Sequence, residues 1–182
     1  MLRFRGTSVA LLLCAALTSC GDSSSGEFSS DEAGFSVTVP GGWHGAARPV
    51  DGVTTNPREL FVLSTFDVPR YLGPAQGCGP FYDHALSHMG DDQALVAVRE
   101  RIGNEVAGPD EFPARPASFE LKPVEPEAGG CEHRDARRRF RRWWIMFEDG
   151  GRDFYAQVDM GLGAPDSLRE DAQRALDSMK LR

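Results

Sequence analysis

Histidines and cysteines are the side chains of this sequence best suited to metal or acid–base chemistry. His84 and His88 stand four positions apart, so a helix would present both imidazoles to one metal ion. His133, which follows Cys131 closely, offers a third ligand. However, no glutamate completes an HExxH arrangement, and His88 borders an apolar stripe where packed histidines are common. We therefore expect no metal ion and no cofactor, with a metalloenzyme as an alternative.

Nucleophilic catalysis finds little support in the sequence. A Gly-x-Ser-x-Gly elbow is absent from it. Two pairs of neighbouring acids, Asp91-Asp92 and Asp110-Glu111, are more simply interpreted as solvated turns, because acid–base work by two carboxyl groups needs a cleft. We expect a protein without catalytic residues, and a cell-envelope hydrolase is the enzymatic alternative.

Arginine is concentrated between residues 134 and 144, where it is mixed with aromatic side chains. Guanidinium groups bind phosphate and other anions, and outside a cell the available anions are lipid head groups and wall polymers. One hypothesis is therefore an anion-binding surface made of Arg137, Arg138, Arg139 and Arg141. The formal net charge of −7 argues against a nucleic-acid binder.

The alternative for the same stretch is a solvated loop that runs into a β-strand. Side chains of a strand alternate between its two faces. One face would then carry Trp143, Ile145 and Phe147, and the other Phe140, Arg142, Trp144 and Met146.

The first twenty residues have the pattern of an export signal. Arg3 and Arg5 give a basic start, residues 7–17 form an apolar run, and small residues lead to Cys20. A helix that spans a bilayer needs about 20 apolar residues, so this run is too short to remain as a membrane span. We expect it to be removed during export.

The ending Leu17-Thr18-Ser19-Cys20 resembles the bacterial lipobox. The resemblance implies that the Cys20 sulfur receives a diacylglyceryl group and that a peptidase cuts directly before it. Acyl chains in pairs anchor firmly, whereas one chain binds only marginally. We expect a signal peptide at 1–19, a lipidated cysteine and flexible polar tether at 20–32, and one globular domain at 33–182, held on the outer face of the cell membrane. The alternative is an ordinary cleaved signal with a chance cysteine.

Two further cysteines, Cys78 and Cys131, remain after Cys14 leaves with the signal and Cys20 is lipidated. An even pair in an oxidising compartment predicts a Cys78–Cys131 disulfide, which would stabilise the fold by roughly 4 kcal/mol in the chain-entropy model. Two metal-bound thiolates are the rival interpretation, although neither cysteine has a CxxC partner.

Apolar periodicity predicts the elements that would position these groups. Strands are predicted at 35–39, 60–66, 94–101, 116–121, 140–147 and 153–160. Glycines between the last two strands predict a tight hairpin turn. Helices are predicted at 80–89, with a left-handed cap at Gly90, and at 166–179, with a capping box of Ser167 and Glu170 or a rival cap at Asp166. We expect an α+β domain, an antiparallel β-sheet covered by helices.

The pattern also resembles PsbP-like lipoproteins of high-GC Gram-positive bacteria. The resemblance rests on Gly34 to Pro40 followed by Gly42-Trp43, on the strand Arg152 to Val158, and on a final helix that ends with Leu176 to Leu181. It implies an α/β/α sandwich and an accessory or binding protein rather than an enzyme.

We therefore expect a monomeric, non-catalytic domain that contacts an envelope protein, or an anionic lipid or wall polymer. A small-ligand or lipid carrier, with a pocket lined by Trp43, Trp143 and Trp144, is the alternative.

Overall fold

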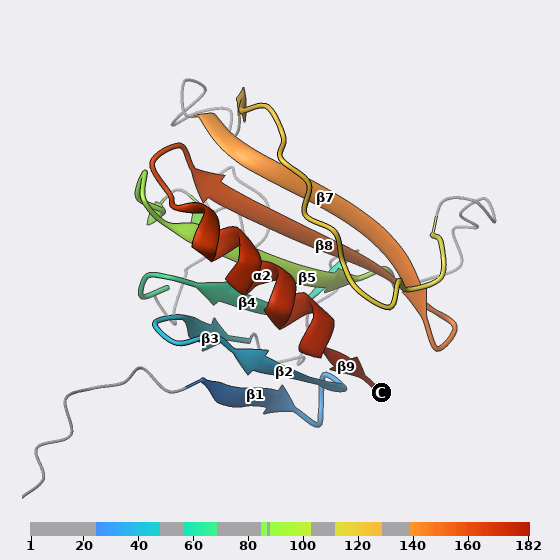
Figure 1. The fold of residues 1–182 in the computed structure, drawn as a ribbon. Helices are drawn as coiled ribbons and strands as arrows, with labels where there is room; N and C mark the ends of the chain where they lie inside the picture. Colours follow the sequence, from blue (N-terminus) through green and yellow to red (C-terminus); the bar gives the residue numbers. More distant parts are fainter. Residues whose placement is uncertain (1–24, 48–56, 69–84, 87, 103–111, 129–138) are drawn as a thin grey trace, which may run out of the picture.

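The computed structural model describes residues 25–47, 57–68, 85–86, 88–102, 112–128 and 139–182. The named strands pair antiparallel and form two sheets, with helix α2 (Asp166–Ser178) packed on them (Figure 1). The smaller sheet has the order β1–β2–β9, which are Gly26–Ser30, Phe35–Val39 and Lys180–Leu181. The larger sheet has the order β3–β4–β5–β8–β7–β6, which are His44–Ala46, Arg58–Ser64, Ala94–Glu100, Arg152–Gly161, Arg139–Asp149 and Glu127–Ala128. The expected α+β fold is confirmed.

The hairpin of β7 and β8 is the longest pairing in the larger sheet. Its turn consists of Gly150 and Gly151, which have φ angles of 62° and 78°. Two consecutive positive φ angles match the twist of the flanking strands, and glycine adopts them without steric cost. The predicted hairpin is therefore confirmed, and its alternation places Trp143 and Trp144 on opposite faces of the sheet.

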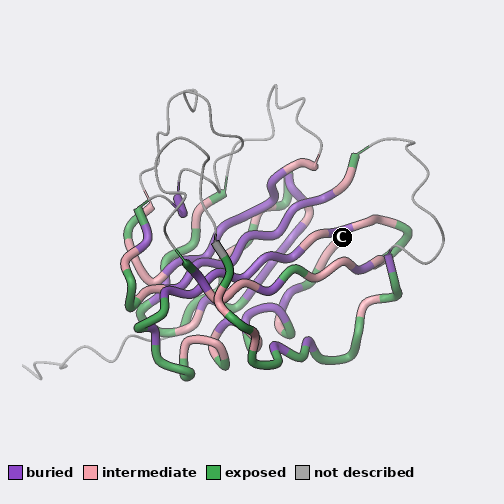
Figure 2. The backbone as a smooth tube through the Cα atoms, turned by 90° about the horizontal axis from the view of Figure 1, so that it is seen from above, coloured by how far each residue is buried: buried purple, intermediate pink, exposed green. Residues whose placement is uncertain are grey.

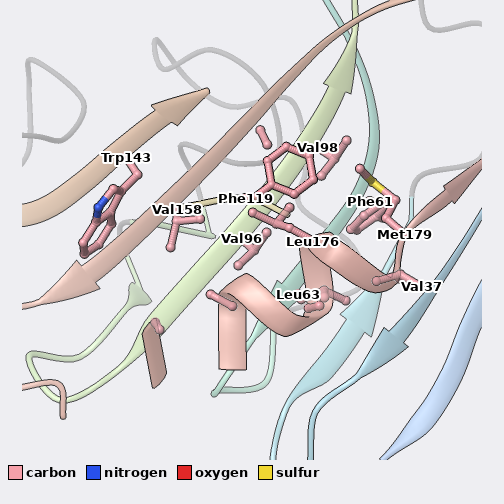
Figure 3. Close-up of a cluster of buried hydrophobic side chains, with 14 of the residues drawn as sticks. Val37, Phe61, Leu63, Val96, Val98, Phe119, Trp143, Val158, Leu176 and Met179 are labelled. Atoms are coloured by element: carbon pink, nitrogen blue, oxygen red, sulfur yellow. The ribbon is translucent and has the colours of Figure 1, made fainter. Parts of the chain in front are cut away.

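The main core lies between α2 and one face of the larger sheet, called the inner face below. β5 is buried along its whole length, and buried residues gather in the middle of the molecule (Figure 2). Leu176 of α2 and Met179, which directly follows the helix, meet apolar side chains from several strands (Figure 3). These strand residues include Val37, Phe61, Leu63, Val96, Val98 and Val158. Each such side chain contributes roughly 1.5–3 kcal/mol through removal of apolar surface from water.

The opposite face of the larger sheet, called the outer face below, is partly covered by a second apolar cluster. Ala85, Leu86 and His88 are helical, which places a helix within the predicted range 80–89. The cluster consists of Val62, Ala85, Leu86, Met89, Leu95, Ala97 and Phe140. Helical residues thus lie on both faces of the sheet.

Gly90 ends this helical stretch differently from the prediction. It is not among the glycines with positive φ, so the predicted left-handed cap is wrong. Its backbone N–H instead donates to Oε1 of Gln93 at 2.5 Å, which satisfies the group without a left-handed residue.

Residues 112–128, called the strap below, run along α2 and β7 and appear in yellow in Figure 1. Phe119 and Leu121 are buried in the main core. The backbone N–H of Phe119 donates to Oδ1 of Asp177 at 2.7 Å, and that of Leu121 to Oε1 of Gln173 at 3.4 Å. Because side chains of α2 take these backbone groups, the predicted strand at 116–121 is wrong.

The carboxyl end of α2 is satisfied by an arginine from the strap. Nη2 of Arg115 donates to the carbonyl oxygens of Leu176 at 3.2 Å and Met179 at 2.7 Å. Its Nη1 contacts Oδ2 of Asp149 at 2.9 Å. The last carbonyls of a helix have no partner within the helix, so a cation here stabilises the helix end.

The amino end of α2 does not form the predicted capping box. The residue at the cap is Pro165, and no side chain makes a capping hydrogen bond. Asp166, the rival cap, instead accepts a hydrogen bond from Arg141 on β7 at 3.1 Å. The helix is thereby fixed to the sheet through an ion pair rather than through its own cap.

The end of the expected tether is a strand instead. Residues Gly26–Ser30 form β1, which pairs with β2 along its whole length. The ring of Phe28 lies 5.5 Å from that of Phe35, and a Cβ atom on Gly45 would come within 2.8 Å of it. One aromatic side chain over a bare glycine thus orders a segment that its polar composition assigned to the tether. The boundary at residue 32 stays a prediction.

Candidate binding surface on the outer face of the sheet

Asp159 is a fully buried carboxyl group on the outer face of β8. Its Oδ1 accepts a hydrogen bond from Nε of Arg142 on β7 at 2.6 Å, and its Oδ2 accepts one from Nε2 of Gln157 at 3.1 Å. Burial raises the pKa of Asp159 well above its usual value, because desolvation penalises the carboxylate form. The contact with Arg142 opposes this effect by favouring the charged form. The group acts as a tie between two strands.

Arg142 extends the tie to the edge strand. Its Nη1 lies 3.5 Å from Oε1 of Glu127 on β6, while its Nε binds Asp159. One guanidinium group therefore links β6, β7 and β8. Because a guanidinium group offers several donors in a fixed plane, it can serve two carboxylates at once.

Two further residues of opposite charge lie on the outer face, near the start of β4 and the end of β5. Glu59 of β4 and Arg99 of β5 are partners in the strand register, and both are buried. Arg99 also reaches towards β7, where its Cζ lies 5.9 Å from the ring centroid of Trp144. Opposite charges in register stabilise a strand pair, and a cation near an indole face adds a further attraction.

Trp144 is the exposed centre of an aromatic group on this face. Trp144 is 48% exposed, whereas its neighbour Trp143 is 6% exposed. The ring of Tyr155 on β8 lies 5.3 Å from that of Trp144, and the ring of Phe112 lies 5.1 Å from that of Tyr155. The name Trp144 cluster is used below for Trp144, Tyr155, Phe112 and Arg99.

The Trp144 cluster is chemically suited to contact rather than to catalysis. Aromatic residues and arginine are enriched at protein interfaces, where tryptophan and arginine often contribute most of the binding energy. Tyr155 and Arg99 hold the indole in place, so binding would cost little side-chain entropy.

The arginines of the anion-binding hypothesis are only partly within the described residues. Arg137 and Arg138 lie outside them. Arg139 donates to the carbonyl oxygen of Pro126 at 2.5 Å. Arg141 donates to the carbonyl oxygens of Gly161 and Ala164 as well as to Asp166. Arg139 and Arg141 therefore have structural partners, and the hypothesis stays a prediction.

The three tryptophans do not line one pocket. Trp43 and Trp143 are buried in the main core on the inner face, and the indole of Trp143 donates to the carbonyl oxygen of Lys122 at 2.5 Å. Trp144 lies on the outer face. The alternative of one pocket lined by all three tryptophans is therefore wrong, because Trp143 and Trp144 are neighbours on a strand and must point to opposite sides.

Most of the other histidines and cysteines that could take part in chemistry lie outside the described residues. His88 is exposed, while His84, His133, Cys131, Cys78 and Cys20 lie outside the described residues. Asp91 has a structural role, since its Oδ1 accepts from the backbone N–H of Leu162 at 3.2 Å. Within the described part of the chain, no three potential ligands lie close enough to hold a metal ion.

Most of the outer face was missed from the sequence, although a signal for it exists. In β8, Tyr155, Gln157 and Asp159 alternate with buried apolar residues. Such alternation marks one polar face of a strand. What the sequence did not reveal is that this polar face would itself be buried at Asp159 and paired with Arg142.

No protein-family model and no curated protein matches the sequence. Among solved structures, the chain is similar to the solution structure of cyanobacterial PsbP (CyanoP) from Synechocystis sp. PCC 6803. The sequence identity is 14%, the match covers 91% of this chain and 99% of that chain, and the TM-score is 0.41. Nothing about the outer face follows from a similarity at this level.

Proposed function

We propose that the protein is a lipid-anchored, extracytoplasmic accessory domain that binds a partner protein through the Trp144 cluster. The observation that carries the binding role is the exposed indole of Trp144 on the outer face of β7, held by Tyr155 and Arg99. The proposal assigns no catalytic step to the domain.

The anchoring part of the proposal rests on the amino-terminal sequence. A basic start, a short apolar run and the ending Leu17-Thr18-Ser19-Cys20 support export and lipidation at Cys20. Within the described residues, no helix is long and apolar enough to cross a bilayer.

A protein partner is favoured over an anionic polymer by the way the arginines are used. Arg139 and Arg141 donate to backbone and carboxylate groups of the domain itself. The Trp144 cluster instead presents the exposed indole of Trp144, and tryptophan is enriched at protein contacts.

Replacement of Trp144 by alanine tests the binding role. We expect Trp144→Ala to lower recovery of the partner from membrane extracts by roughly 30-fold, because loss of a central tryptophan typically costs 2 kcal/mol or more. Leu162→Ala is the matched control, since Leu162 is 47% exposed but lies outside the cluster. It should recover the partner like the unaltered protein.

The readout is quantitative mass spectrometry of proteins retained by each variant, with thermal unfolding as a check on folding. Equal recovery of every retained protein by Trp144→Ala and the unaltered protein would contradict the binding role.

A further inference from the structure

The outer edge of β7 has a gap in its pairing. β6 pairs with β7 only at Arg139 and Phe140, and the next contact is at Glu148. There the backbone N–H of Glu148 donates to the carbonyl oxygen of Pro113 at 2.7 Å, and its carbonyl accepts from the N–H of Arg115 at 2.8 Å. Within the described residues, no strand pairs with β7 between Phe140 and Glu148 on this side.

Backbone groups in this gap point outwards. Glu148 shows that the even-numbered residues of β7 direct their N–H and C=O groups away from β8. Because this direction alternates along a strand, Trp144 and Met146 must do the same. Both residues thus present a donor and an acceptor at the edge, in the arrangement that an added strand requires.

The strap is unable to close the gap. Between its contacts with Glu148 and Phe140 it turns onto the inner face, where Phe119 and Leu121 enter the core. The backbone N–H groups of Phe119 and Leu121 donate to side chains of α2, and the four prolines of the strap lack the N–H that a strand ladder needs. Among the described residues, the strap and β6 therefore pair with β7 at the two ends of the gap and not in its middle.

A second copy of β7 does not fit the gap. Antiparallel pairing centred on Trp144 would bring the copy's Glu148 beside Phe140, where β6 already lies. The copy's Phe140 would likewise meet the strap beside Glu148. The gap holds about five residues of extended chain, or roughly 17 Å, so its occupant must be short.

The side chains around the gap indicate the chemistry of that occupant. Trp144, at the centre of the gap, offers an exposed indole on the outer face. Arg139 is exposed at one end, while Glu148 and Asp149 lie at the other. An antiparallel segment would end beside Glu127 of β6, which already pairs with Phe140, and so would not reach Arg139. The side chain that decides the chemistry of the occupant is therefore Trp144, which favours an apolar partner.

We propose that the outer edge of β7 between Phe140 and Glu148 binds a short extended segment of a partner protein as an added antiparallel strand. The segment carries an apolar side chain that packs on Trp144. This inference rests on the proposed function, because it specifies how the partner reaches the Trp144 cluster. Strand addition gives affinity through the backbone and specificity through alternate side chains.

The probe is a displayed library of linear seven-residue peptides, selected on the full-length chain in detergent. An enriched peptide is then made with N-methyl groups along one edge or along the other. N-methylation of the edge that faces β7 should weaken binding about tenfold or more, because it removes hydrogen bonds, and N-methylation of the other edge should not.

Two protein variants give the complementary test. Met146→Pro removes one outward N–H and should weaken binding about tenfold, while Met146→Ala keeps the N–H and should stay within about threefold. Amide hydrogen exchange at Trp144 and Met146 should slow when the peptide binds.

Two results would overturn strand addition: no peptide is enriched, or binding is indifferent to N-methylation on both edges. A peptide that depends on Trp144 but not on N-methylation would leave the proposed function standing and remove only the added strand.

Discussion

Glu100 shows how single residues set the stability of this fold. Its Oε1 accepts from Nε of Arg152 at 2.7 Å, and its Oε2 accepts from Arg58. Burial alone would raise the pKa of Glu100, but the hydrogen bonds from Arg152 and Arg58 outweigh it, and the pKa is lowered. The hydrogen bond to Glu100 correspondingly raises the pKa of Arg152. One carboxylate thus holds the ends of β4, β5 and β8 together.

Glu100→Gln should destabilise the domain by about 2 kcal/mol at pH 7, the range for hydrogen bonds to charged groups. Because the folded-state pKa lies below the ordinary 4.5, the carboxylate stabilises the fold above about pH 4.5. This stabilisation is lost as the pH falls through the folded-state pKa, so the gap between variant and unaltered protein should close in acid.

Urea unfolding between pH 3 and pH 7 measures this gap. The control is Glu120→Gln, because Glu120 is 72% exposed in an ion pair with Lys122 and its removal should cost at most about 0.5 kcal/mol. A gap for Glu100→Gln that stays constant across this pH range would refute the assigned role.

At the scale of elements, the carboxyl end of α2 is stabilised mainly by hydrogen bonds from the strap. Arg115 binds the last carbonyls of α2 and Asp149 of β7, and the N–H of Phe119 binds Asp177. A segment without regular structure therefore joins the helix end to the hairpin.

Arg115→Ala should lower the free energy of unfolding by about 2 kcal/mol, because charged hydrogen bonds to helix carbonyls and to a carboxylate are lost. Arg174→Ala is the matched control, since Arg174 is exposed on α2 and pairs only within the helix with Asp171, worth about 0.3–0.5 kcal/mol. Equal losses in urea unfolding for the two variants would show that the strap does not support the helix end.

The elements predictable from the sequence are those with a local periodic signal. β2, β5, the β7–β8 hairpin and α2 were found because their apolar residues repeat at strand or helix spacing. β1 was missed because a single residue, Phe28, provides its packing against Gly45. The course of the strap was missed because it depends on distant partners such as Asp177 and Gln173.

The candidate surface shows the same division. Trp144 and Arg142 were assigned to one face of β7 by alternation alone. Their partners Tyr155 and Asp159 depend on the hairpin register, and Arg99 depends on the pairing of β5 with β8. Alternation therefore predicts which residues share a face of β7, whereas their partners on β8 and β5 depend on the strand pairing.

At the scale of the whole molecule, β1 and the open edge of β7 lie on opposite sides (Figure 1). β1 begins close in sequence to Cys20, the proposed lipid site. Under the proposed anchoring, β1 is the strand next to the tether, and the β7 edge points to the far side of the domain. A partner could then reach this edge without displacing the anchor.

Cys20→Ser should abolish lipid attachment and release the protein from the membrane fraction. Metabolic labelling with an alkyne fatty acid measures the first effect, and fractionation measures the second. Cys14→Ser is the matched control, because Cys14 would leave with the signal and its loss should change neither result. Undiminished labelling of Cys20→Ser would exclude this cysteine as the lipid site.

The central claim is that the outer face around Trp144 is the surface by which the domain binds a partner. Photo-crosslinking in intact cells tests it most directly, with the crosslinker placed at position 144, at position 146 or at the control position 162. We predict that positions 144 and 146 crosslink to the same envelope protein and that position 162 does not. Crosslinking to that protein at 162 as strongly as at 144, or no adduct at 144 and 146, would contradict the claim.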